Sequence, residues 1–322
     1  MLQKFDARNK DLIVNINGRL VHRDQAGVSP FDSAVQGGDA VWEGLRLYSG
    51  RIFRLREHLD RLRSSAIALA FEKIPSHEEI TEQIRATLKA NGMVDGVHIR
   101  LTLTRGLKVT SGMDPRLNQS GPTLIVLAEH KPPVYGSGET GIKLVTSSVR
   151  RFPPDCLDPK IHHCNLIPSI LAKIQANQAG ADDALMLDMR GFVAETNATH
   201  VFLVEEAIRR RDAATQQAPG LRVVTPTCAA CPEGITRGVV IELCAVNGIE
   251  CVERDVSLTE VYRASEVFCT GTMGELVPVV EVDGRRIGTS APGAMTGWLQ
   301  GLFREVVSRE GEVVVERGKQ AR

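Results

Sequence analysis

Residues 158–173 read DPKIHHCNLIPSILAK and crowd Lys160, His162, His163 and Cys164 directly ahead of a predicted helix. Two chemistries fit this stretch. The histidines and the cysteine are of the types that bind zinc, whereas the lysine is of the type that forms imines with carbonyl compounds. A lysine becomes a nucleophile when burial, a neighbouring cation or a helix N-terminus destabilises its ammonium form, and we expect apolar surroundings for Lys160. The rest of the chain decides between the two interpretations.

Composition narrows the classes of protein that the chain can represent. Its 322 residues are 43% hydrophobic and 24% charged, which is typical of globular proteins, and the length favours two domains. Lysine plus arginine and aspartate plus glutamate each number 39, so no basic excess points to nucleic acid or an anionic membrane. No apolar signal core or membrane-length run occurs. We therefore expect a cytoplasmic protein with reduced cysteines and neither nucleic acid nor membrane as partner.

Residues 1–130 predict a small N-terminal α/β domain. Asn17 and Gly18 between two strand-like runs are a strong hairpin signal. Ser76 and Glu79 form a capping box at the start of a helix. A preceding helix is expected to bury one face, which carries Leu55, Leu59, Leu62 and Ala66.

Residues 131–141, KPPVYGSGETG, are rich in proline and glycine and predict an interdomain linker. Their formal G-x-G-x-x-G fingerprint lacks the preceding strand and following helix that dinucleotide binding needs. Residues 142–322 then predict a larger C-terminal domain in which strands dominate. The charged stretch 308–322 is expected to be a frayed tail.

Two segments of the C-terminal domain predict anion-binding turns. In PEGITRG, Gly234, Ile235 and Thr236 lead into a helix whose free amides can hold a phosphate. In CTGTMGE, the turn at Thr272 follows a strand and can direct consecutive amides at a second anion. Each segment also has an ordinary interpretation, as a helix cap or a tight turn. Together with a candidate amine nucleophile, however, they favour pyridoxal 5′-phosphate, which offers a phosphate, an aldehyde and a pyridine nitrogen.

The zinc interpretation would join the His162–Cys164 group to Cys228 and Cys231, a C-x-x-C pair. Adjacent ligands diverge in direction, and no second C-x-x-C pair exists. Ordinary loop cysteines are therefore favoured, and we expect no metal site.

The chain resembles a known family, the fold-type-IV pyridoxal-phosphate enzymes. The segments that carry the resemblance are FDSAVQGGDAVWEGLRLYSG, FRLREHLDRL, VHIRLTLTRG, GFVAETNATHVFLV, CPEGITRG and GTMGELVPV, together with the stretch that begins at residue 159. The group comprises branched-chain aminotransferases, D-amino-acid aminotransferases and aminodeoxychorismate lyases, and GDAVWEGLR is most similar to the first. The resemblance implies an α+β fold of two domains, the larger with a barrel-like sheet.

The resemblance also implies roles for individual residues. Lys160 would be the catalytic residue and form the internal Schiff base, while Glu195 would pair with the pyridinium nitrogen. The cofactor-binding residues that it implies are Arg61, Lys160, Glu195, Ile235, Thr236 and Thr272. The substrate-binding residues are Gly37, His98, Arg100, Met273 and Gly274.

The chain departs from the family at three positions where tyrosine is usual, namely Gly37, His98 and Leu166. All three hydroxyls are missing, which leaves open how the substrate is recognised. We predict a pyridoxal-phosphate-dependent aminotransferase that moves an amino group between an amino acid and 2-oxoglutarate. The resemblance implies an L-branched-chain amino acid as the donor and at least a homodimer as the assembly. A D-amino-acid aminotransferase or aminodeoxychorismate lyase is the alternative, and a zinc or thiol binding protein using Cys228 and Cys231 a remoter one.

Overall fold

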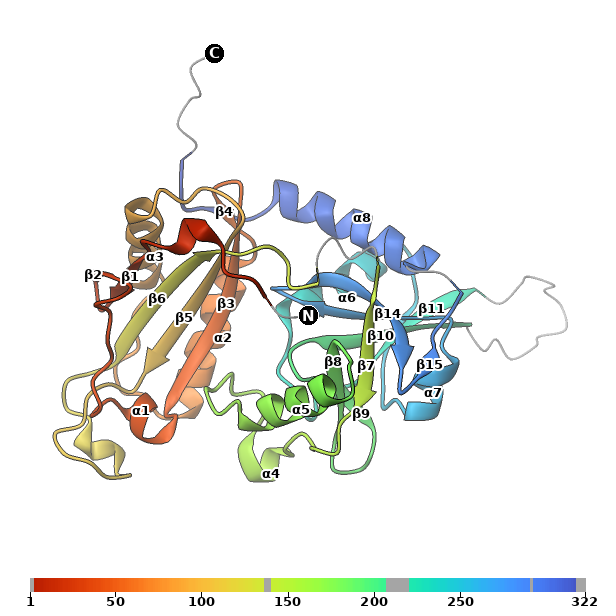
Figure 1. Ribbon diagram of the computed structural model, residues 1–322, viewed down its shortest axis with the longest axis horizontal. Helices are drawn as coiled ribbons and strands as arrows, with labels where there is room; N and C mark the ends of the chain where they lie inside the picture. Colours follow the sequence, from red (N-terminus) through yellow and green to blue (C-terminus); the bar gives the residue numbers. More distant parts are fainter. Residues whose placement is uncertain (1–2, 136–139, 207–219, 290–291, 317–322) are drawn as a thin grey trace, which may run out of the picture. The chain divides into compact units, whose positions relative to one another are not determined.

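The computed structural model describes residues 3–135, 140–206, 220–289 and 292–316, and these ranges form two compact units (Figure 1). Of the described residues, the N-terminal unit holds those of 3–132, 161–166 and 306–316, and the C-terminal unit holds those of 133–160 and 167–305. The expected domain boundaries instead put 161–166 and 306–322 in the C-terminal domain. Residues 136–139 of the expected linker, with most of its G-x-G-x-x-G fingerprint, lie outside the described ranges.

In the described part of the N-terminal unit, seven strands form a sheet in the order β16-β4-β3-β5-β6-β1-β2. The strands are β1 (Ile13–Ile16), β2 (Arg19–His22), β3 (Ala40–Tyr48), β4 (Arg51–Ile52), β5 (Val97–Thr104), β6 (Thr123–His130) and β16 (Glu312–Val313). The helices are η1 (Ala7–Asn9), α1 (Ser33–Gly37), α2 (Leu55–Ala68), α3 (His77–Ala90) and η2 (Pro115–Leu117). Helix α2 lies against β3, and α3 lies against β6 and β1 (Figure 1).

Local signals in this half of the chain are confirmed. Asn17 and Gly18 both have positive φ angles and join β1 to β2. Ser76 and Glu79 form the capping box of α3. The four apolar residues expected on one face of α2 are all buried, because that face packs on the sheet.

The described part of the charged C-terminal stretch differs from the expected frayed tail, whereas residues 317–322 lie outside the described ranges. Residues 312–313 form β16 and pair with β4, and Val314 is buried in the core of the N-terminal unit. The valine run 313–315 explains the difference, since apolar β-branched residues favour an edge strand in spite of the neighbouring charges.

In the described part of the C-terminal unit, nine strands form a curled half-barrel, with the order β12-β11-β10-β13-β14-β7-β8-β9 and β15 paired to β14. The strands are β7 (Ile142–Thr146), β8 (Asp183–Leu187), β9 (Val193–Thr196), β10 (His200–Glu206), β11 (Leu221–Thr225), β12 (Cys251–Glu253), β13 (Glu266–Gly271), β14 (Glu275–Val282) and β15 (Arg285–Arg286). The helices are α4 (Pro154–Leu157), α5 (Ile167–Gln178), α6 (Ile235–Val246), α7 (Leu258–Arg263) and α8 (Ala294–Arg309).

Helix α5 connects the parallel strands β7 and β8. Its Ala172 and Ala176 pack against Ala184 and Met186 of β8, so small residues allow the helix to approach the sheet closely. Pro168 is tolerated because it lies in the first turn, where its missing amide would have no partner. Among the helices of the described ranges, none combines the length and apolarity needed to cross a membrane.

Two substitutions on α2 test the assignment of its buried face. Leu59 is 2% exposed, so Leu59→Ala is expected to lower the free energy of unfolding by about 2–5 kcal/mol through lost burial and a residual cavity. Ile67 is 57% exposed, and Ile67→Ala is expected to change the free energy of unfolding by no more than about 0.5 kcal/mol. Urea unfolding monitored by circular dichroism gives both values. Equal effects of the two changes would contradict the assignment.

Candidate functional site

Lys160 closes the first segment of the C-terminal unit, in a turn after α4. Its backbone amide donates to Asp158 Oδ1 at 2.9 Å, and its Nζ lies 3.1 Å from Glu233 Oε1. The side chain is 54% exposed, and the hydrogen bond to Glu233 raises the pKa of the lysine. The expectation of apolar surroundings for Lys160 was therefore wrong: its ammonium is stabilised here by a carboxylate, not destabilised by burial.

Glu195 lies on β9, the end strand of the sheet, which pairs with β8, and its side chain is buried. Arg151 Nη2 lies 2.6 Å from Glu195 Oε1, and His200 Nδ1 lies 3.8 Å from Oε2. Arg151 also donates to the Ala230 carbonyl at 3.3 Å and to the Ser169 hydroxyl at 3.2 Å. A buried carboxylate held by a fixed arginine has a defined direction, which suits it to bind a cationic group.

The first predicted anion-binding turn is the N-terminus of α6. Gly234 is the N-cap residue and makes no side-chain capping bond, while Ile235 and Thr236 form the first turn. A Cβ atom at Gly234 would overlap the His200 ring, so only glycine fits here. The amides of this turn, the Thr236 hydroxyl and the positive end of the helix dipole suit an anion.

The second predicted turn, with Thr272, Met273 and Gly274, joins β13 to β14. The Met273 carbonyl accepts the Val134 amide at 3.0 Å, which ties the turn to the segment before β7. A Cβ at Gly274 would lie 2.7 Å from the Tyr135 ring, so the close approach of that ring requires glycine.

In the N-terminal unit, Arg61 on α2 forms a bidentate ion pair with Glu43 on β3. Arg61 Nε donates to Glu43 Oε1 and Nη2 to Oε2, each at 2.7 Å. His58 Nδ1 lies 2.7 Å from Oε2 and His162 Nδ1 lies 3.2 Å from Oε1. Burial by itself raises the pKa of Glu43, but Arg61 and His162 outweigh it, so that the pKa lies well below its usual value.

Arg100 lies on β5 and stacks on Trp42 of the neighbouring strand, with its Cζ 3.5 Å from the ring centroid. The His162 ring stacks on the same indole at a centroid distance of 4.1 Å. Trp42 therefore contacts both a cation and an imidazole, and the stacking fixes the direction of the Arg100 guanidinium.

His98 and Gly37 take positions where tyrosine is usual in the family that the chain resembles. His98 on β5 is buried, and its Nδ1 has no hydrogen-bond partner among the described residues. Burial, followed by the charges of Lys131, Arg100 and Arg46, lowers the pKa of His98 to about 3. Gly37 ends α1, and a Cβ there would meet nothing within 4 Å.

The zinc interpretation was the alternative that the sequence disfavoured, and in the described part of the chain possible metal ligands are grouped at one place. The group of possible metal ligands found there combines Glu195, His200 and Cys231, with ligand atoms within 4.8 Å of one another. His162 is instead bound to Glu43.

The sequence did not identify the residues that contact the predicted site residues and fix their positions. These residues are Trp42, Glu43, His58 and Arg151. A signal for Glu43 does exist, because strand alternation puts it in one row with Val41, Leu45 and Leu47, which are fully buried. A charged residue in such a row requires partners. Arg151 carries no comparable signal.

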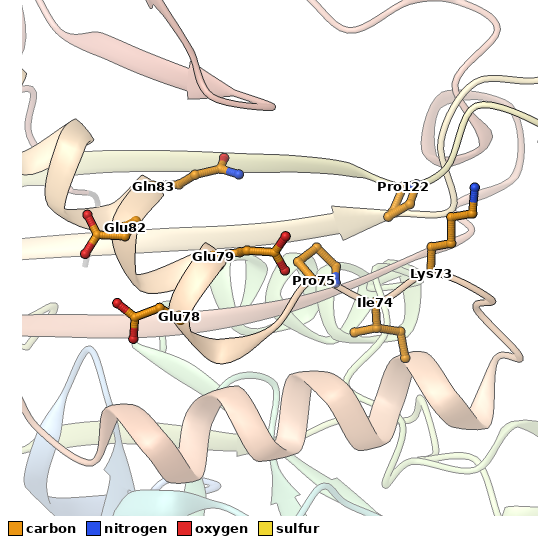
Figure 2. A pocket seen from close by; sticks show the side chains of 8 residues that line it. All are labelled: Lys73, Ile74, Pro75, Glu78, Glu79, Glu82, Gln83 and Pro122. Atoms are coloured by element: carbon orange, nitrogen blue, oxygen red, sulfur yellow. The ribbon is translucent and has the colours of Figure 1, made fainter.

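Two surface cavities of the N-terminal unit lie away from these residues. One, of 580 Å³, has the α3 side chains Glu78, Glu79 and Glu82 along one wall and Lys73 and Pro122 opposite (Figure 2). The other, of 550 Å³, includes Arg105 and Arg116. No predicted site residue lines either cavity.

Comparison with known proteins supports the resemblance. A family model described as amino-transferase class IV matches residues 40–282. The branched-chain-amino-acid aminotransferase-like protein 2 of Arabidopsis thaliana is 52% identical over 303 residues, which cover 94% of this chain and 52% of that protein. A putative branched-chain-amino-acid aminotransferase of Methanocaldococcus jannaschii is 39% identical over 298 residues, covering 92% of this chain and 97% of that protein.

Among solved structures, the branched-chain amino acid aminotransferase of T.th., complexed with N-(5′-phosphopyridoxyl)-L-glutamate, is similar with a TM-score of 0.81 and 32% identity. The match covers 93% of this chain and 95% of that one. The expected family and its fold-type-IV architecture are confirmed. The chain spans about half, 52%, of the length of the first curated relatives that it matches, both from Arabidopsis thaliana.

The lowered pKa of His98 predicts a contribution to acid sensitivity. Because the folded pKa of about 3 lies below the usual 6.5, unfolding takes up a proton between these values, and stability present above pH 6.5 is lost as the pH falls. His98→Gln is expected to remove about 2 kcal/mol of the stability difference between pH 7 and pH 5. Urea unfolding of both proteins at the two pH values measures it. An unchanged difference would show that His98 titrates normally.

Proposed function

The chain belongs to the class IV aminotransferases, and from this premise we propose that it transfers an amino group from an L-branched-chain amino acid to 2-oxoglutarate. Members of this class use pyridoxal 5′-phosphate. The observation that carries the proposal is the family match over residues 40–282 together with the buried, arginine-held carboxylate of Glu195 in that range. A cytoplasmic location remains part of the proposal on the sequence grounds given above.

The residues present fit this cofactor. A phosphate dianion suits the uncapped N-terminus of α6, with the Ile235 and Thr236 amides, and the hydroxyl of Thr272. A protonated pyridine nitrogen suits the buried carboxylate of Glu195. Arg61 adds a guanidinium in a fixed direction. These groups would hold the cofactor, and Lys160 would bind it covalently through Nζ.

Bound pyridoxal phosphate supplies an aldehyde for amines and a ring that withdraws electrons from the substrate's Cα. The chain's own residues do the rest. Lys160 Nζ, once displaced by the substrate amine and neutral, would remove the proton from Cα as general base and give it back as general acid. Glu195, directed by Arg151, would keep the pyridine nitrogen protonated.

Substrate recognition would depend on a second set of residues. Arg100 would bind a substrate carboxylate, with its guanidinium held on Trp42. The amides at Met273 and Gly274 would bind the α-carboxylate. Gly37 and His98 would adjoin the substrate side chain.

A homodimer is also part of the proposal. Helix α5 exposes four apolar side chains at helical spacing, Ile167, Ile170, Leu171 and Ile174, between 45% and 62% accessible. A contiguous apolar stripe of this kind marks an interaction surface, and a second copy of the chain can bury it through a two-fold axis.

The first test of the proposed activity is Lys160→Ala. The variant is expected to lose about 10²- to 10⁴-fold in the rate of glutamate formation from L-leucine and 2-oxoglutarate, because it lacks the general base. Lys143→Ala is the matched control, since Lys143 also lies 3.1 Å from a glutamate and is 53% exposed.

Three outcomes would contradict the assignment. Activity retained by Lys160→Ala would exclude the lysine, and a response to D-leucine alone would favour a D-amino-acid aminotransferase. Release of product from aminodeoxychorismate without an oxo acid would instead identify a lyase.

The proposed interface is tested by Ile170→Arg, which puts a charge in the apolar stripe of α5. The variant is expected to shift the protein from dimer to monomer at micromolar concentration, as measured by size-exclusion chromatography with light scattering. Ile67→Arg on α2 is the control, because Ile67 is similarly exposed, at 57% against 51% for Ile170. A dimer that survives Ile170→Arg would locate the interface elsewhere.

A further inference from the structure

Glu43 is a fully buried carboxylate within the apolar core of the N-terminal unit. Its strand neighbours Val41 and Leu45 belong to that core, as does Leu62 of the opposing helix. Burying a charge in such surroundings is unfavourable by several kcal/mol before partners compensate. An apolar residue of similar volume would often be equally stable at such a position. The presence of a carboxylate therefore indicates a role other than stability.

The carboxylate has four hydrogen-bond contacts, two at each oxygen. Oε1 receives Arg61 Nε and faces His162 Nδ1, and Oε2 receives Arg61 Nη2 and faces His58 Nδ1. An ionised carboxylate only accepts, so each of the two imidazole nitrogens carries its proton. With its acceptor sites occupied, Glu43 has no remaining capacity for a ligand and can act only through its partners.

Among the partners of Glu43, Arg61 is the one suited to bind a ligand. A bidentate bond between a carboxylate and a guanidinium fixes both the plane and the direction of the guanidinium. Arg61 retains 16% side-chain exposure, whereas Glu43 has none. The arginine is thus held from its buried side.

His162 keeps the carboxylate in place from the other side. Its backbone carbonyl accepts the Trp42 amide at 3.0 Å, and its own amide donates to the Ser65 hydroxyl at 3.0 Å. With its ring stacked on Trp42, the imidazole has little freedom to move. It is two residues beyond Lys160, in the segment that joins β3.

We propose that Glu43, held by His162, is a positioning residue that directs the Arg61 guanidinium toward the phosphate of the cofactor. This inference rests on the proposed function, in which Arg61 binds that phosphate. A positioning role and a simple charge effect predict opposite changes in the affinity for the phosphate when Glu43 is neutralised. Removal of the negative charge beside Arg61 would strengthen anion binding by Coulomb attraction alone, whereas loss of the fixed direction would weaken it.

The experiment compares pyridoxal 5′-phosphate with pyridoxal, which lacks the phosphate. Dissociation constants of both compounds for the protein freed of cofactor, from absorbance titration, give a ratio that measures phosphate discrimination. Glu43→Gln is expected to lower this ratio about tenfold, the effect of misdirecting one charged hydrogen bond. Glu82→Gln on α3 removes the same charge at an exposed position and is expected to leave the ratio unchanged.

A double-mutant cycle separates positioning from general damage to the fold. If Glu43 acts through Arg61, Glu43→Gln has no further effect on the ratio in an Arg61→Ala background. Additive effects would overturn the inference. His162→Ala keeps the ion pair between Glu43 and Arg61 and is expected to lower the ratio about threefold. This variant replaces Glu43→Gln in the test if Glu43→Gln does not fold. An unchanged ratio in a folded His162→Ala protein would also overturn it.

The outcomes distinguish the inference from the proposed function. A wild-type protein that binds the two compounds equally would contradict the proposed function itself. A wild-type protein that prefers the phosphorylated compound, with Glu43→Gln equal to it or stronger, would contradict only the positioning role.

Discussion

A charge in the apolar face of β3 is the constraint on which the N-terminal unit depends. Alternation along the strand places Glu43 in one row with Val41 and Leu45, facing α2. A carboxylate there must be compensated, and α2 supplies His58 and Arg61 at the i, i+3 spacing that shares one helix face. The register of α2 on the sheet therefore depends on an ion pair as well as on apolar packing.

The C-terminal unit contains a second buried carboxylate that is paired with an arginine, Glu195 with Arg151. Four hydrogen-bond contacts fill the acceptor sites of Glu43, so it serves as a support. Glu195 is bound by Arg151 at one oxygen, and His200 stands 3.8 Å from the other. The same pair of residue types thus suits two different tasks, a support for Arg61 at Glu43 and a contact for a cationic group at Glu195.

Lys160 shows how much a motif leaves open. The resemblance assigns a role to this residue, yet its amine is exposed and bound to Glu233, which raises its pKa. A lysine in this state is a cation and no nucleophile. The segment that follows Lys160 is, by contrast, firmly placed, because it adds to the edge of β3 through the backbone of His162 and Cys164.

The sequence by itself determined what depends on near neighbours in the chain. The Asn17–Gly18 hairpin and the capping box of Ser76 and Glu79 involve residues at most three apart, and the buried face of α2 follows from helical periodicity. Family motifs likewise identified the candidate residues. Only the tertiary structure decided which carboxylate holds Arg61, and that His162 joins it from 119 positions away. Local pattern carries no record of such a partner, because packing of separate segments, and not the chain between them, brings the two side chains together.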